Sequence, residues 1–133
     1  AWAFGAGDRT QEMTVQYAKD REQFGKPIGA FQSIAHYLAD RQAELDGAHT
    51  LVHEAAWARA NGRSVGRLAP MAKLFATRVL RDVTATAQQI YGGNGFTLEY
   101  DVQLYFRRAK ALQISWWPTR DLEELIAADV LDT

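Results

Sequence analysis

The chain turns at Arg21-Glu22-Gln23-Phe24-Gly25-Lys26-Pro27-Ile28, a stretch that is followed by Phe31-Gln32 and that separates two segments of helical periodicity. Gly25 can adopt a positive φ at little cost, and Pro27 cannot continue a helix because it has no backbone N–H. A basic residue such as Arg21 is favourable near a helix C-terminus. The stretch by itself therefore predicts a helix end and a tight turn, with a long helix opening at Phe31-Gln32.

Further groups of glycine, proline and asparagine divide the rest of the chain at Asn61-Gly62, at Gly92-Gly93-Asn94-Gly95 and at Trp117-Pro118. Between these breaks apolar residues recur at spacings of three and four, which is the periodicity of amphipathic helices. We expect Asn61-Gly62 to close one long helix in a left-handed cap. The next helix tolerates Pro70 because that residue lies in its first turn.

The predicted helices differ in length. The first long helix carries an apolar stripe of Phe31, Ile34, Leu38, Leu45, Val52 and Ala56. The second long helix carries a stripe of Leu68, Met71, Phe75, Val79, Val83 and Ile90. Asp101 is expected to cap a shorter helix with its side chain, and a last helix follows Pro118. Strand-like alternation is absent. The fold predicted is all-α, an antiparallel four-helix-type bundle with a short extra C-terminal helix.

Composition narrows the classes of function. The 133 residues correspond to one domain, with 47% hydrophobic residues, 23% charged residues and a net charge of −1. Nucleic-acid binding is not expected without a surplus of basic residues. No apolar run approaches the roughly 20 residues that span a bilayer, so no membrane span is predicted. The absence of cysteine excludes disulfides and thiolate metal sites, and is consistent with a reducing compartment.

Individual motifs are weak when each is taken alone. The glycine-rich run from Gln89 to Phe96 allows close backbone approach to a ligand, but it is neither a Walker loop nor a dinucleotide fingerprint. Arg107-Arg108-Ala109-Lys110 is the polar face of a helix, and Trp116-Trp117 suits a core or an interface. His49 and His53 have a metal-pair spacing, yet no third ligand is evident, so no metal site is predicted.

Together and in order, these motifs resemble the C-terminal helical domain of the acyl-CoA dehydrogenase family. The motifs are Arg-x-x-Phe-Gly-x-Pro-Ile, Phe-Gln, Ala-Lys-Leu-Phe-Ala, Gln-Ile-Tyr-Gly-Gly-Asn-Gly-Phe, Glu-Tyr and Arg-x-Ala-Lys. The resemblance implies that residues 1–133 are a piece of a longer flavoprotein. Its N-terminal helical domain and its β-domain would then lie outside this chain.

The resemblance also implies a cofactor and its contacts. In the family this domain holds the pyrophosphate and adenosine of a neighbouring subunit's FAD. The positions that match are Arg21, Gln23, Phe24, Gln32, Gln89 and Gly93. Arginine suits a pyrophosphate, and glycine permits close backbone approach.

One position departs from the family pattern. The family reaction is α,β-dehydrogenation of an acyl-CoA thioester, and its usual catalytic glutamate aligns with Trp116. An indole carries no basic lone pair, so Trp116 cannot be a general base. Three explanations stay open: a heteromer whose partner subunit supplies the base, a base upstream of Ala1, or a scaffold that has lost dehydrogenation.

Several expectations about the whole protein follow from the resemblance. We expect a homo- or hetero-oligomer that shares FAD across its subunit interface, an acyl-CoA substrate from lipid metabolism and an electron acceptor flavoprotein. The compartment would be the cytoplasm, or the mitochondrial matrix in a eukaryote. The isolated chain is expected to be inactive. The alternative function is a non-catalytic helical scaffold for oligomerisation.

Overall fold

The computed structural model describes residues 1–131 as a helical bundle with one very short β-hairpin. In chain order its elements are α1 (Trp2–Asp20), β1 (Glu22–Gln23), β2 (Lys26–Pro27), the 3₁₀ turn η1 (Ile28–Ala30), α2 (Gln32–Ala60), α3 (Leu68–Tyr91), the 3₁₀ turn η2 (Gly92–Phe96), α4 (Val102–Ile114) and α5 (Thr119–Val130). None of these helices combines the length and the apolar character required to cross a membrane.

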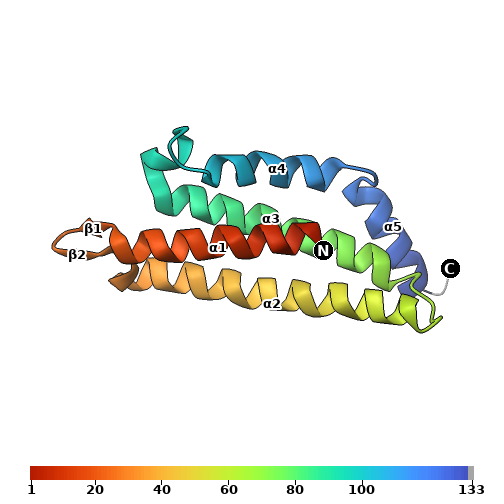
Figure 1. Cartoon of the computed structure of the whole chain (residues 1–133). Coiled ribbons are helices and arrows are strands. Elements are labelled where there is room, and N and C mark those ends of the chain that lie inside the picture. The colour runs from red at the N-terminus through yellow and green to blue at the C-terminus, as the bar shows by residue number, and fades with distance from the viewer. Residues whose placement is uncertain (132–133) are drawn as a thin grey trace.

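The first four helices run up and down, and α5 crosses one end of the bundle beside the start of α3 (Figure 1). α3 is the central helix, since it packs against α1, α2, α4 and α5. This arrangement confirms the all-α, antiparallel four-helix-type bundle with an extra C-terminal helix. The hairpin and η2 lie at the same end of the bundle, opposite α5 (Figure 1).

The core is built where α3 meets its neighbours. Leu80 of α3 and Leu45 of α2 are both fully buried, and Val83 is 1% exposed. α1 approaches closely at Gly7, because a Cβ there would stand 2.5 Å from a methyl carbon of Leu45. The buried threonine Thr84 satisfies its hydroxyl by donating to the Leu80 carbonyl one turn earlier. Burial of apolar side chains is therefore the main contribution to packing in this core.

The outward face of the bundle differs from the predicted stripes. Ala56 of α2 is exposed and Phe75 of α3 is 38% exposed. α2 buries only Leu45, Ala48 and Ala58 within the described chain. The periodicity gave the correct helices, but it overestimated the width of their buried faces, because α2 has packing partners on one side only.

One predicted helix end is confirmed and one predicted cap is wrong. Gly62 has a φ of 68°, and the bonds from Gly62 N to Arg59 O and from Arg63 N to Ala58 O complete a Schellman motif. Asp101 occupies the N-cap position of α4, but its side chain makes no capping hydrogen bond. Its φ of −68° and ψ of −14° are helical, so the side chain lacks the extended backbone that aims a cap at the free N–H groups.

The hairpin was not predicted. Glu22 pairs with Pro27 and Gln23 with Lys26, so Phe24 and Gly25 form a two-residue loop between the strands. Both loop residues have a positive φ, 55° and 79°, as a type I′ turn requires. Strands of two residues are too short to produce an alternating pattern, so only the turn itself was detectable in the sequence.

Candidate functional site

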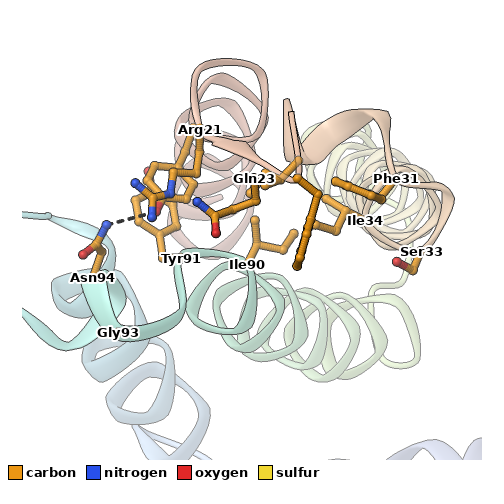
Figure 2. Close-up of a pocket in the computed structure, with 12 residues that line it drawn as sticks. Arg21, Gln23, Phe31, Ser33, Ile34, Ile90, Tyr91, Gly93 and Asn94 are labelled. Carbon is orange, nitrogen blue, oxygen red and sulfur yellow. Dashed lines mark hydrogen bonds between the residues drawn. The ribbon is translucent and has the colours of Figure 1, made fainter. Parts of the chain in front are cut away.

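A groove of about 440 Å³ lies between the hairpin, the start of α2 and the junction of α3 with η2 (Figure 2). Its volume falls within the usual range for ligand sites. We call it the hairpin groove, and it is lined by Tyr17, Arg21, Gln23, Phe24, Ile28, Phe31, Ser33, Ile34, Ile90, Tyr91, Gly93 and Asn94. Figure 2 shows that Arg21 and Gln23 lie on one wall, while Gly93 and Asn94 form the other.

Arg21 is the charged member of the groove. Its backbone is fixed on both sides, because its N–H donates to the Tyr17 carbonyl at 2.8 Å and its carbonyl accepts from Ile28 N at 2.8 Å. Among the lining residues no other side chain is charged, and no described carboxylate forms an ion pair with Arg21. The guanidinium is therefore exposed with free donors, an arrangement that suits an anion such as a phosphate.

Phe24 presents an aromatic ring in an unusual backbone conformation. Its φ is 55°, which a bulky L-residue rarely adopts, and its side chain is 93% exposed. The ring lies edge-on to Phe31 at 6.2 Å between centroids, and Lys26 Nζ stands 4.3 Å from the Phe31 centroid. Backbone strain at an exposed aromatic residue is typical of a ligand contact rather than of packing.

The glycine-rich turn supplies the opposite wall. Gly92 has a φ of 59° and a ψ of −133°, a conformation that favours glycine. A Cβ added at Gly93 would meet nothing within 4 Å, so the space beside its backbone is open. Asn94, next in the chain, donates from Nδ2 to the Tyr17 hydroxyl at 3.0 Å. A ligand in the groove can therefore approach the Gly93 backbone closely.

The structure brings together four of the six residues predicted for the cofactor: Arg21, Gln23, Phe24 and Gly93. Gln32 and Gln89 are exposed but do not line the groove. Ala87 and Gln88 occupy the buried face of α3, and the helical rotation of about 100° per residue carries Gln89 off that face. The cofactor contacts themselves stay a prediction.

Tyr17, Tyr91 and Asn94 line the groove but were not singled out from the sequence. Tyr17 lies one helical turn before Arg21, and Asn94 is part of the glycine-rich run. These spacings were visible, but nothing in the sequence indicated that the two residues meet. Burial raises the pKa of the Tyr91 hydroxyl, with smaller contributions from Tyr17 and Tyr100 and an opposing one from Arg9.

A second unusual backbone conformation lies just after the C-terminal end of α4. Trp116 has a φ of 66° and is 80% exposed, and Trp117 N donates to the Ser115 carbonyl at 2.9 Å across it. The three residues form a γ-turn with a positive central φ, which is rare and strained for a non-glycine residue. Residues 115–118 are called the tryptophan loop below.

Lys73 of α3 lies beside this loop. Its Nζ donates to the Leu112 carbonyl in the last turn of α4 and stands 5.8 Å from the Trp116 ring centroid. Burial lowers the pKa of the Lys73 ammonium. A cation at free carbonyls stabilises a helix C-terminus, so Lys73 holds the end of α4 from which the tryptophan loop leaves.

Trp116 lies between two cavities, of about 280 Å³ and about 500 Å³, and Lys73 lines both. Neither cavity has an Asp or Glu among its described lining residues. Glu99 and Asp121, the two carboxylates considered from the sequence, line neither cavity. Among the described residues, the linings of these two cavities therefore contain no carboxylate that could take a proton.

The histidine pair of α2 has a structural explanation. His49 Nε2 is 2.8 Å from Asp8 Oδ2 of α1, and its ring lies 4.0 Å from that of Phe4. His53 also contacts Phe4, edge-on at 5.8 Å. Across residues 1–131, no three His, Asp or Glu side chains gather as a metal site would require. The pair joins α1 to α2.

The chain matches a known protein family in sequence. The model of the C-terminal domain of acyl-CoA dehydrogenase matches residues 1–117. The acyl-CoA dehydrogenase IpdE2 of Mycolicibacterium smegmatis is 40% identical over 126 residues, which cover 95% of this chain and 39% of that protein.

Solved structures agree with the sequence match. Butyryl-CoA dehydrogenase from Megasphaera elsdenii superimposes with a TM-score of 0.94 at 36% identity, covering 97% of this chain and 34% of that chain. A FAD complex of PigA superimposes with a TM-score of 0.93 at 26% identity, covering 96% of this chain and 33% of that chain. The chain therefore spans little more than a third of the length of these relatives.

Proposed function

Because the chain belongs to the acyl-CoA dehydrogenase family as its C-terminal helical domain, we propose that its hairpin groove holds the pyrophosphate and adenosine end of FAD. The rest of the flavin site would come from the helical and β domains outside this chain and from a second subunit. The assembled protein would act on an acyl-CoA thioester and pass electrons to an acceptor flavoprotein.

One observation carries the proposal. Arg21, without an ion-pair partner in the described chain, is the charged residue of a groove that also contains open space at the Gly93 backbone. A guanidinium can bind a pyrophosphate through charge-assisted hydrogen bonds, and the exposed ring of Phe24 offers a surface for a planar base. The charge and the close backbone approach suit the pyrophosphate of an adenosine diphosphate group, and the aromatic surface suits its adenine.

The residues of this chain bind and position, while bound FAD supplies the redox chemistry. Arg21 would offset part of the negative charge of the pyrophosphate, and the Gly93 backbone would limit how far the group can shift. Gln32 and Gln89 do not line the groove, so no contact is assigned to them within it. The groove itself offers no carboxylate among its described residues, so no proton transfer is assigned to it.

Proton abstraction would depend on a residue outside the tryptophan loop. On the family resemblance Trp116 would occupy the position of the usual base, and no Asp or Glu is among the described residues that line the cavities beside it. We favour a heteromer whose partner subunit carries the catalytic base over a base in an upstream segment, and rank an inactive scaffold third. The compartment proposed is the cytoplasm, or the mitochondrial matrix in a eukaryote.

The test is Arg21→Ala in the longest natural polypeptide that contains this domain, purified with any partner subunit. FAD should bind the unmodified assembly and dissociate from the variant with a Kd raised roughly 10- to 150-fold, as expected for a lost charge-assisted contact. Arg120→Ala is the matched control, because Arg120 is exposed and pairs only with Glu124 one turn away.

Equal FAD binding by the Arg21 and Arg120 variants would refute the assignment of the hairpin groove. An unmodified assembly that forms oligomers but binds no FAD would instead support the alternative function, a non-catalytic helical scaffold. Circular dichroism of both variants distinguishes loss of a ligand contact from loss of the fold, since an exposed arginine contributes little to stability.

A further inference from the structure

Tyr17 makes contact with both walls of the hairpin groove. Its backbone carbonyl accepts the N–H of Arg21 at 2.8 Å, and its hydroxyl accepts from Asn94 Nδ2 at 3.0 Å. Its ring stacks on that of Tyr91, with centroids 4.0 Å apart and planes inclined by 14°. Arg21 follows Tyr17 by one helical turn, and Asn94 is separated from it by 77 positions.

A second polar bond also joins α1 to the end of α3, from the Tyr91 hydroxyl to the Met13 carbonyl at 3.1 Å, but it does not involve Gly93 or Asn94. Arg21 ends α1, whereas Gly93 and Asn94 belong to η2 beyond the end of α3. In Figure 2 the Tyr17–Asn94 hydrogen bond is the dashed line that ends at Asn94, at one end of the groove. The Tyr17–Asn94 hydrogen bond therefore ties Asn94 of the glycine wall directly to α1, one helical turn before Arg21.

Packing alone does not require the Tyr17 hydroxyl. A phenylalanine could make the same stack on Tyr91, and Tyr91 satisfies its own hydroxyl by donating to the Met13 carbonyl at 3.1 Å. Tyr100 contacts both rings edge-on, at 6.0 Å from Tyr17 and 5.4 Å from Tyr91. The rings of Tyr17, Tyr91 and Tyr100 thus keep their contacts without the Tyr17 hydroxyl. The remaining role of that hydroxyl is its hydrogen bond with Asn94.

We propose that Tyr17 is a positioning residue whose hydroxyl holds Asn94, and with it the Gly93 backbone, at the spacing from Arg21 that an adenosine diphosphate group requires. This inference rests on the proposed function of the groove. Tyr17 need not touch FAD to act. Preorganisation of the two walls lowers the cost of ordering them when the ligand binds.

The decisive variants are Tyr17→Phe, Asn94→Ala and the double variant, in the same flavin-binding assembly. Each single change should raise the Kd of FAD about 2- to 12-fold, the range for one lost hydrogen bond. The double variant should show no additional loss, because both changes remove the same bond. Tyr100→Phe is the matched control: it alters the same aromatic cluster without touching the hydroxyl that Asn94 contacts, and should leave the Kd unchanged.

Hydrogen exchange of the assembly without FAD gives a second readout. Amides of η2 should exchange faster in Tyr17→Phe than in the unmodified protein, and Tyr100→Phe should leave them unchanged. Unaltered exchange in Tyr17→Phe would overturn the inference, as would additive losses in the double variant. If Arg21→Ala weakens FAD binding while Tyr17→Phe does not, the positioning role of Tyr17 is refuted and the proposed function of the groove stands. If Arg21→Ala has no effect on FAD binding, the proposed function itself is refuted.

Discussion

Replacing Gly95 by alanine should destabilise the domain, whereas the same change two residues earlier, at Gly93, should not. A Cβ at Gly95 would stand 2.5 Å from Gln88 Oε1, 3.2 Å from Tyr91 Cβ and 3.3 Å from the Gln88 backbone carbonyl. A Cβ at Gly93 would meet nothing within 4 Å. The two glycines therefore differ in packing although they belong to one turn.

The size of the destabilisation expected for Gly95→Ala depends on which of the neighbouring atoms can move. The Gln88 amide is flexible, but Gln88 is only 7% exposed, so it has little room to rotate. Tyr91 Cβ and the Gln88 carbonyl belong to the last turn of α3 and cannot shift independently. Overpacking typically costs about 1–3 kcal/mol, and the lower entropy of the unfolded chain returns about 0.4–1 kcal/mol.

Gly95→Ala should thus lower the free energy of unfolding by about 1–2 kcal/mol, or the melting temperature by roughly 3–10 °C for a domain of this size. Gly93→Ala should be neutral or stabilising by up to about 1 kcal/mol. Thermal and urea unfolding of the 133-residue chain, followed by circular dichroism, measures both.

The Gly93→Ala and Gly95→Ala variants also distinguish a glycine required for packing from a glycine required for ligand contact. In the flavin-binding assembly Gly93→Ala should weaken FAD binding, because its methyl group would occupy the open space beside the groove. A Gly95→Ala protein as stable as the original would refute the packing argument. Gly93→Ala binding FAD with unchanged affinity would refute the close approach of the ligand to that backbone.

Two further predictions concern the tryptophan loop and the aromatic cluster. Trp116→Glu alone should create no acyl-CoA-dependent flavin bleaching, because a base must lie within hydrogen-bond reach of its proton and the bulky Trp117 and the rigid Pro118 would still shape the loop. Bleaching gained from this change would show that only the base had been lost. Because burial raises the pKa of Tyr91 above 10.0, the folded chain keeps this proton where the unfolded chain releases it, so stability should fall as pH rises above about 10. Urea titrations at several alkaline pH values should give a shallower decline for Tyr91→Phe, and an equal slope would contradict the burial of that hydroxyl.

Local backbone chemistry made much of this protein predictable from its sequence. Gly62 ends α2 and Gly25 turns the hairpin because glycine adopts a positive φ without a Cβ clash. Pro70 lies in the first turn of α3, where a missing N–H costs nothing. Arg21 and Gly93, found through ordered motifs around such turns, do meet in one groove.

Only the tertiary structure decided how these segments face one another. Tyr17 lines the groove and Gln89 does not. This difference depends on how α1 and α3 are rotated about their axes where they pack, and a periodic pattern does not determine that rotation. The Tyr17–Asn94 bond joins positions 77 apart, and neither residue indicates the other. Trp116 adopts its positive φ because α4 ends beside Lys73 and the chain must turn into α5. Local conformation depends on each residue and its neighbours, whereas the site depends on which helix faces pack together.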